Sequence, residues 1–207
     1  MTTWTLPHEL LYLIRDPENG RSPVSANPTH LTLAAALVEA ELGGFVGLHE
    51  RRARRTRVGP SGVGVIDQVL RKLDDPDGSV LITSLITAKD WTMHRETLPD
   101  RLVLDDLVRD GHLLTEPTGT FQRSRYRPSS PARRETLLAE IVRPLREGTP
   151  VDRRQAERIA LLDTFHLLGG VIDEPVLGRV LDRLRPLRRQ ASASGEIRAA
   201  LAERELV

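Results

Sequence analysis

The spacing of apolar residues predicts helices along most of the amino-terminal half of the chain. Residues 8–14 form a short apolar run that ends at an acidic, glycine-containing turn. Residues 29–42 carry leucine and alanine at helical spacing, with Thr29 as the expected cap and the glycine pair at 43–44 as the end. Residues 65–73 are amphipathic in the same way, so this half is expected to be mainly helical.

The carboxyl-terminal half shows the same period. Apolar positions line one face of 98–110, and the preceding Thr97–Asp100 sequence is similar to a capping box. Gly111 is expected to end this helix. Further helices are predicted at 132–146, at 152–168 with Asp152 as cap, at 175–187, and after a break of small residues at 191–195.

Three segments carry strand signals instead. Residues 45–49 predict a short strand, whereas 80–86 is apolar throughout and fits a buried helix or a strand equally well. Residues 113–115 and 121–127 flank a loop that contains proline and glycine, which predicts a β-hairpin. The expected fold is mainly α: a single-domain helical bundle over residues 1–207 with short β-hairpins, the clearest one at about 112–127.

Composition narrows the class of protein. The 207 residues have 39% hydrophobic side chains, and 30 basic residues nearly balance 29 acidic ones. No apolar run approaches the roughly 18 residues of a transmembrane helix, so a folded, non-spanning chain is expected. The absence of cysteine excludes disulfides and thiolate metal sites. With no signal-peptide pattern at the start of the chain, a cytoplasmic location is expected.

No catalytic or metal-binding arrangement is visible. The six histidines never occur at metal-ligand spacing, and the glycine-rich loop at 59–64 lacks the features of a phosphate-binding or dinucleotide-binding loop. Ser61 is followed directly by Gly62, which does not fit the Gly-x-Ser-x-Gly pattern of a nucleophile elbow. The acidic pairs at 74–75 and 105–106 are neighbours that point in different directions on a helix. We therefore expect no enzyme activity, no cofactor and no metal.

Arginine is distributed unevenly, and two clusters are candidates for contact with anions. Arg51, Arg52, Arg54, Arg55 and Arg57 lie together beside the first strand, where they form either a solvated turn or a surface for anionic lipid headgroups. Arg123, Arg125 and Arg127 alternate along the hairpin, which places them on one face of the strand. These eight arginines are the basic membrane-facing candidates.

A helix followed by a hairpin also suggests a winged-helix DNA-binding regulator, which would use the 98–110 helix and the 112–127 hairpin. The recognition helix would then carry four aspartates against Arg101 and Arg109, a net charge of −2 where phosphate requires cations. The chain has only seven aromatic residues, which disfavours a base-stacking surface. Nucleic acid is therefore the alternative partner rather than the expected one.

Taken together, several segments resemble the Golgi phosphoprotein 3 family in order and spacing. They are the apolar helix and acidic Gly-Arg turn at 6–21, the small-residue helix at 36–43, the loop and helix at 59–70, the Leu-Val-x-x-Gly-x-Leu step at 107–113, the segment at 121–128 and the Ala/Leu-rich helix at 152–168. The resemblance covers residues from about 6 to 190.

The resemblance implies a helical, cytoplasmic, peripheral membrane protein that recognises phosphatidylinositol 4-phosphate without catalysis. Its partner would be an anionic phospholipid membrane surface on the inner face of the membrane. The family binds the headgroup in a shallow basic pocket, and its hairpin helps membrane contact or self-association, so a homo-oligomer through the hairpin is also implied.

The family's four headgroup residues fall at Val24, Leu33, Thr97 and Asp100 of this chain, and none of the four is matched. Other polar residues lie near these positions and are the ones expected to form an anionic pocket. They are Arg21, His30, Trp91, His94, Arg95 and Arg101.

Overall fold

The computed structural model describes residues 4–22, 27–74, 78–87, 98–118, 123–172 and 174–203. The helices are α1 (Leu6–Leu13), α2 (Pro28–Leu42), α3 (Gly64–Lys72), α4 (Ile82–Thr87), α6 (Pro99–Arg109), α7 (Pro131–Glu147), α8 (Arg153–Thr164), α9 (Leu168–Val171), α10 (Glu174–Gln190) and α11 (Ser192–Ala202). The strands are β1 (Val46–His49), β2 (Arg52–Arg55), β3 (Val80–Leu81), β4 (Leu113–Thr118) and β5 (Arg123–Pro128). The mainly α fold expected from the sequence is confirmed.

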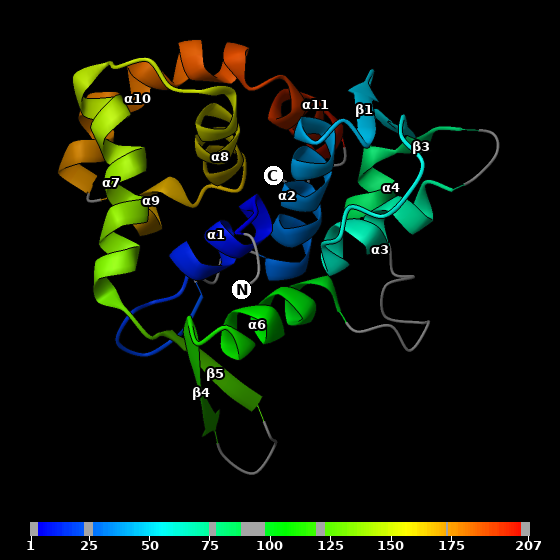
Figure 1. Cartoon of the computed structure of the whole chain (residues 1–207). Helices are drawn as coiled ribbons and strands as arrows, with labels where there is room; N and C mark the ends of the chain where they lie inside the picture. The colour runs from blue at the N-terminus through cyan, green and yellow to red at the C-terminus, as the bar shows by residue number, and fades with distance from the viewer. Residues whose placement is uncertain are drawn as a thin grey trace.

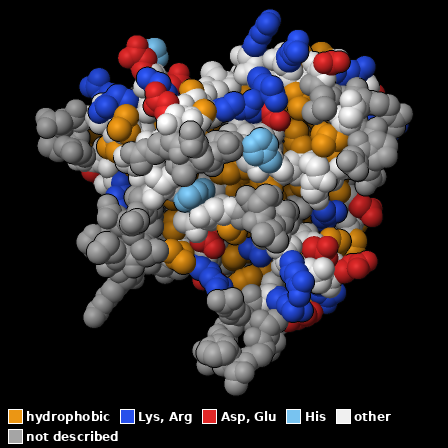
Figure 2. Space-filling model, turned by 180° about the vertical axis from the view of Figure 1, so that it is seen from behind, with side chains coloured by type: hydrophobic (Ala, Val, Ile, Leu, Met, Phe, Trp, Pro, Cys, Tyr) orange, Lys and Arg blue, Asp and Glu red, His pale blue; other side chains and the backbone are white. Residues whose placement is uncertain are grey.

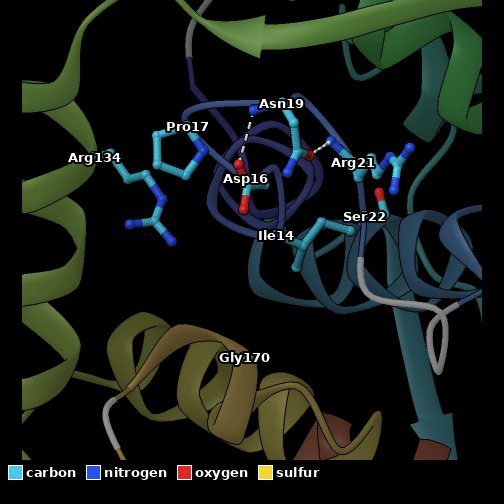
Figure 3. A pocket seen from close by; sticks show the side chains of 8 residues that line it. All are labelled: Ile14, Asp16, Pro17, Asn19, Arg21, Ser22, Arg134 and Gly170. Carbon is cyan, nitrogen blue, oxygen red and sulfur yellow. Dashed lines mark hydrogen bonds between the residues drawn. The ribbon is translucent and has the colours of Figure 1, made fainter.

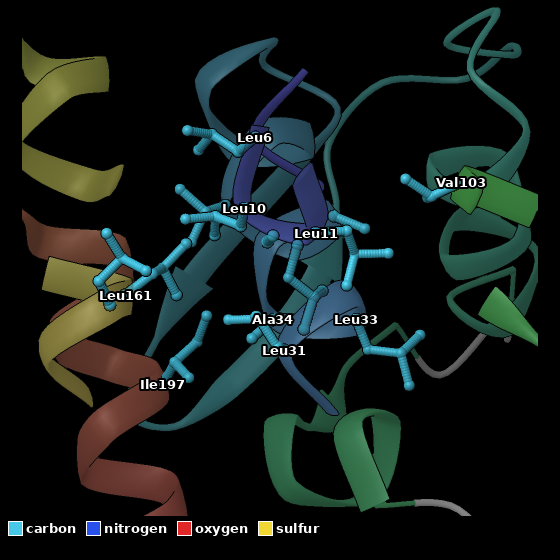
Figure 4. Packing of buried hydrophobic residues seen from close by; sticks show 14 of the residues in the cluster. Leu6, Leu10, Leu11, Leu31, Leu33, Ala34, Val103, Leu161 and Ile197 are labelled. Carbon is cyan, nitrogen blue, oxygen red and sulfur yellow. The ribbon is translucent and has the colours of Figure 1, made fainter. Parts of the chain in front are cut away.

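Helix α2 is the centre of the molecule (Figure 1). Leu31, Leu33 and Leu37 are fully buried, and so are the three alanines at 34–36. Because alanine has no side chain beyond Cβ, neighbouring helices approach the α2 backbone closely, and α1, α3, α4, α6, α8 and α11 all pack against it. The leucines of α1 and side chains from α6, α8 and α11 complete this core (Figure 4).

The start of α2 differs from the sequence expectation. The cap is Asn27, whose side-chain oxygen accepts hydrogen bonds from the backbone N–H groups of Thr29 and His30 at 3.0 and 3.3 Å. Pro28 then occupies the first helical position, where no N–H is needed. Thr29 is therefore inside the helix, and its hydroxyl is free to bond elsewhere.

A three-stranded antiparallel sheet with the order β1-β2-β3 lies beside α3 and α4. Strand β1 matches the prediction, but β2 lies in the arginine-rich segment that the sequence did not assign to a strand. Ala53 faces the core in this strand, whereas Arg52 and Arg54 are exposed. The segment at 80–86, which fits a helix or a strand in sequence, contains one of each, because the short strand β3 passes directly into helix α4.

The hairpin β4–β5 is longer than predicted. Glu116 pairs with Arg125, so residues 116–118 extend β4 instead of forming the turn. Helix α6 begins at Pro99, with Leu98 in the cap position and no side-chain cap. Thr97 of the expected capping box lies outside the described residues.

The long helix expected over 152–168 is divided in two. Asp152 caps α8 as predicted, through a bond to the N–H of Gln155, but the helix ends at Thr164. His166 then has a positive φ of 54°, and the short α9 follows. At the carboxyl end, α11 begins at Ser192, so most of the small residues expected to form a break are helical.

Two arginines of α8 form ion pairs with glutamates of other helices, and of these pairs only that of Arg158 with Glu9 is buried on both sides. Arg158 of α8, 2% exposed, bonds to Glu9 at 3.0 Å and to Glu140 at 2.8 Å. Arg154 bonds to Glu9 at 2.8 Å and to Glu39 at 3.3 Å. These ion pairs connect α8 to α1, α2 and α7, and removing one partner would leave a buried charge uncompensated.

Candidate functional site

The loop that joins α1 to α2 is built by its own side chains. The Asp16 carboxylate accepts hydrogen bonds from the N–H groups of Glu18 and Asn19 at 2.9 and 2.8 Å. The Asn19 side-chain oxygen accepts from the N–H of Arg21 at 2.9 Å. The acidic turn expected at this position is therefore formed, and its carboxylate is engaged in holding the backbone.

Gly20 brings this loop against strand β5. Its φ is +68°, and an added Cβ would lie 2.8 Å from the carbonyl oxygen of Tyr126. Both observations require glycine, because a left-handed backbone is unfavourable for other residues and their Cβ would clash with the strand. The loop and the hairpin thus meet backbone to backbone.

Two arginines flank the Tyr126 side chain at this junction. The guanidinium carbon of Arg15 lies 5.7 Å from the centre of the Tyr126 ring, and that of Arg101 lies 5.5 Å from it. Arg101 also donates a hydrogen bond to the Tyr126 hydroxyl. The Nε of Arg15 is buried without a hydrogen-bond partner. We call Arg15 and Arg101 the arginine pair.

The electrostatics of the arginine pair favour an added anion. Burial lowers the pKa of Arg15; the carboxylate of Asp100 and the Tyr126 side chain act to raise it, and the charge of Arg101 lowers it further. A guanidinium nevertheless stays protonated. Two like charges held in one partly buried place are stabilised by a negative group that approaches them.

The first turn of α6 is tied to the first turn of α2 beside the arginine pair. The Thr29 hydroxyl donates to the Asp100 carboxylate at 2.8 Å. His30 follows Thr29, and burial lowers its pKa from 6.5, so its imidazole is mostly neutral at pH 7. Asp100, one of the positions of the family's headgroup residues, is therefore used for structure here.

The structure groups the predicted pocket residues only in part. Arg101 belongs to the arginine pair, and His30 lies next in sequence to the residue that anchors α6. Arg21 is exposed on the loop between α1 and α2. Trp91, His94 and Arg95 lie outside the described residues. Sequence reasoning missed Arg15, although its place at the end of α1, directly before the acidic turn, was a signal that could have found it.

Two of the four unmatched family positions lie outside the described residues: Val24 and Thr97. A third, Leu33, is fully buried in the centre of the core. Its side chain packs among other apolar residues (Figure 4) and does not reach the surface. An anion site in this chain therefore has to use cations from other positions.

The arginine cluster at 51–57 is largely engaged within the protein. Arg51 forms an ion pair with Glu203, and Arg55 forms one with Asp74. Arg52 donates to the hydroxyl and the carbonyl of Ser79 at 2.9 and 2.8 Å. These three arginines fasten the sheet to neighbouring segments.

The remaining arginines of this cluster are more accessible. Arg54 is exposed, and the guanidinium carbon of exposed Arg57 lies 4.9 Å from the centre of the Phe45 ring. Figure 2 shows blue and red side chains intermixed over this part of the surface, at its upper left. The cluster is therefore less basic than its sequence indicates.

The hairpin arginines follow the predicted alternation where they are described. Tyr126 is buried, whereas Arg125 is exposed and Arg127 is partly exposed, so the two arginines share the outer face. Arg127 forms an ion pair with Glu116 at 3.3 Å. The side chain of Arg123 lies outside those described. Figure 1 shows the hairpin and the β1–β3 sheet on different sides of the molecule, so the two clusters are separate surfaces.

The exposed face of helix α6 carries charges of both signs. It buries Val103, Leu104 and Leu107 and packs against α1, α2 and α3. Its most exposed charged residues are Asp105 and Arg109, and Arg109 forms an ion pair with Asp106 at 2.6 Å. A recognition helix requires an exposed basic face, so the winged-helix interpretation is disfavoured.

The described residues contain no group of three or more histidine, aspartate or glutamate side chains placed to hold a metal ion. Among the helices described, none has the length and apolar character needed to cross a membrane.

Comparison with known proteins places the chain in a family. No curated protein matches it closely enough to report. The profile of the Golgi phosphoprotein 3 (GPP34) family, in contrast, matches residues 6–204, nearly the whole chain. The matched residues include Arg15, Arg101 and the hairpin residue Tyr126 that lies between them. The chain is thus a member of the Golgi phosphoprotein 3 family.

Proposed function

We propose that this chain is a non-enzymatic peripheral membrane protein whose arginine pair binds the phosphorylated headgroup of an anionic phospholipid, with phosphatidylinositol 4-phosphate as the expected ligand. The observation that carries the proposal is the placement of Arg15 and Arg101 around the Tyr126 ring. Family membership supports a lipid as the source of the anion.

The chemistry of the pair suits a phosphate group. A guanidinium offers several N–H donors in a plane, and its bonds to phosphate are stronger than bonds between neutral groups. Arg15 has a donor nitrogen without a protein partner, and Arg101 uses one N–H on the Tyr126 hydroxyl. Because Asp100 lies close by, it limits the net positive charge. The site therefore favours a compact dianion over a diffuse negative surface.

The hairpin is proposed as the second membrane contact. Leu114 is 45% exposed, and Arg125 and Arg127 lie on the outer face of β5. Cations near an anionic bilayer contribute about 1 kcal/mol each. The loop that carries Arg15 packs on this hairpin, so headgroup and surface contacts would form on one side of the molecule, at the cytoplasmic face of a membrane. The same hairpin is the proposed surface for self-association.

Vesicle co-sedimentation at ~0.15 M salt tests the function. Neutral vesicles, phosphatidylserine vesicles and vesicles containing phosphatidylinositol 4-phosphate are compared for the wild-type chain and for Arg15→Gln and Arg101→Gln. Each substitution is expected to weaken binding to phosphatidylinositol 4-phosphate vesicles about tenfold or more. Arg143→Gln is the matched control, because Arg143 is 74% exposed and forms only a surface pair with Glu147.

The outcomes separate three interpretations. Equal absence of binding to all three vesicle types would refute the lipid function. Equal binding to both anionic types, unchanged in the Arg15 and Arg101 variants, would leave a charge effect without a headgroup site. Tyr126→Phe adds a finer test, since it keeps the ring but removes the hydroxyl that orients Arg101.

A further inference from the structure

A cavity lies on the other side of the loop that carries Arg15. It is bounded by the α1–α2 loop, the first turns of α7 and the short helix α9, and its volume is about 220 Å³. Figure 3 shows Arg134 reaching from α7 toward the loop, with Arg21 and Ser22 on the opposite side and Gly170 of α9 at the base. The polar side chains of the described lining are those of Asp16, Asn19, Arg21, Ser22 and Arg134.

Arg134 gives the cavity a cation that forms no ion pair among the described residues. Its Nε is buried and has no hydrogen-bond partner. Its neighbour Arg133 is used differently, because the guanidinium of Arg133 lies 3.7 Å from the centre of the Trp4 ring. A buried donor nitrogen that stays unpaired costs free energy, and an anion beside the guanidinium of Arg134 would offset part of this cost.

Neutral donors face the same space. The Ser22 hydroxyl is also buried without a hydrogen-bond partner. Asn19 accepts from the Arg21 N–H through its side-chain oxygen, which leaves its amide nitrogen out of that bond. Among the described lining residues, the one carboxylate is that of Asp16, and it already accepts from two backbone N–H groups through one oxygen. The described lining therefore offers more donors than acceptors.

The size of the cavity restricts the ligand. Its volume of about 220 Å³ is below the roughly 300–1,000 Å³ of pockets for drug-sized molecules, so a small ligand fills it best. A tetrahedral oxyanion with a small substituent fits both this volume and the donor set.

We propose that this cavity is a phosphate-binding site, in which Arg134 is the charged ligand and Ser22 and Asn19 are neutral donors to free phosphate or a small phosphate monoester. It is separate from the arginine pair: Arg15 contacts Tyr126 on β5, whereas the cavity lies between the same loop and α7 and α9. The proposal therefore stands whether or not the arginine pair binds lipid.

The test titrates the full chain with inorganic phosphate, with chloride at equal ionic strength as the reference. Binding is followed by NMR chemical-shift changes and by the rise in thermal midpoint, which any ligand of the folded state produces. Arg134→Gln is expected to raise the Kd for phosphate at least about tenfold, and Ser22→Ala about threefold. Arg143→Gln, on the same helix but exposed, should leave the Kd unchanged.

The source of the phosphate is decided by two more probes. Glycerol 3-phosphate represents a soluble monoester, and vesicles containing phosphatidic acid represent a lipid one. Saturable binding of soluble phosphate that Arg134→Gln abolishes supports the site, and parallel loss of vesicle binding would assign it to lipid.

Absence of saturable phosphate binding by the wild-type chain would overturn the proposal, as would equal affinities of the Arg134 and Arg143 variants. If Arg134→Gln does not fold, Arg134→Lys supplies the comparison, because it keeps the charge and removes the planar donor group. Failure of the proposed lipid function is distinguishable, since Arg15→Gln and Arg101→Gln should lose vesicle binding but keep soluble phosphate binding.

Discussion

Glu157 on α8 accepts hydrogen bonds from both the backbone N–H and the hydroxyl of Ser194, at 2.8 and 2.5 Å. The glutamate is fully buried, and its second oxygen accepts from the N–H of Ala193 at 2.9 Å. The first N–H groups of α11 are thus capped by a residue from another helix, in place of the usual local cap. This contact fixes the carboxyl-terminal helix onto α8.

Substitution of Glu157 by glutamine is expected to lower the free energy of unfolding by about 2–4 kcal/mol. The amide would place N–H donors against the N–H groups of α11, which leaves buried donors unpaired. Urea denaturation followed by circular dichroism measures the change. Glu147→Gln removes one exposed ion pair and should cost about 0.5 kcal/mol or less; equal effects of the two variants would contradict the capping role.

Acidification from pH 7.5 to pH 5.5 is expected to destabilise the fold through its histidines. Burial lowers the pKa of His8, His30 and His112, and for His8 this outweighs the opposing charge of Asp106. The unfolded chain binds protons near pH 6.5 while the folded chain does not, so stability is complete above this pH and declines below it. Urea midpoints across this range measure the slope.

His8→Gln separates the contribution of the most buried of the described histidines. His8 is 1% exposed, and its Nδ1 lies 2.7 Å from the Thr5 hydroxyl. The variant is expected to be less stable at every pH but to show a smaller loss between pH 7.5 and pH 5.5. A slope equal to that of the wild-type chain would show that His8 does not contribute to the pH dependence.

Substitution by glutamine is expected to reduce stability more at Arg55 than at Arg54. The Arg55 side chain pairs with Asp74 and donates to the carbonyls of Arg57 and Gly59 at 3.0 and 2.9 Å. Its loss should reduce stability by about 1–2 kcal/mol, whereas Arg54→Gln should change it by less than ~0.5 kcal/mol. Thermal or urea denaturation of the two variants makes the comparison, and equal losses would contradict it.

The same contrast tests membrane contact by this cluster without unfolding it. Reversal of Arg52, Arg54 and Arg55 together would combine a charge effect with a structural one. Arg54→Glu alone should weaken binding to anionic vesicles about fivefold if β2 touches the bilayer. Unchanged binding in co-sedimentation would assign the cluster to structure only.

Introduction of arginine at position 33 is expected to unfold the chain instead of creating a headgroup site. Leu33 is fully buried in the core, and an unpaired charge there costs several kcal/mol. Expression, circular dichroism and vesicle binding of Leu33→Arg measure the result. A folded variant with increased affinity for phosphatidylinositol 4-phosphate would show that position 33 can reach the ligand.

The helices could be predicted where the spacing of apolar residues agreed with the residues that cap or end a helix. Helix α2 follows from its leucines and alanines, and Asp152 was identified as a cap because its role is local. The division between α8 and α9 could not be predicted, because Leu167 and Leu168 continue the apolar pattern while His166 adopts a left-handed backbone. Tertiary packing decides such a break, and the sequence period does not record it.

Strand β2 and the candidate site were harder to predict for a different reason. Strand preference depends on the neighbouring strands, and only the position of Ala53 between β1 and β3 explains a strand made otherwise of arginine. The arginine pair joins α1 and α6 through Tyr126 of β5, three segments far apart in the sequence. Arg101 was predicted from its position near a family site, whereas the place of Arg15 before the acidic turn did not show that the two arginines would meet.

The close contact of Gly20 with Tyr126 couples the position of the hairpin to that of the α1–α2 loop. Because no side chain separates the α1–α2 loop from β5, a tilt of this strand relative to the body would displace the loop. The displacement would reach both Arg15, which lies over the Tyr126 ring, and the part of the loop that lines the Arg134 cavity.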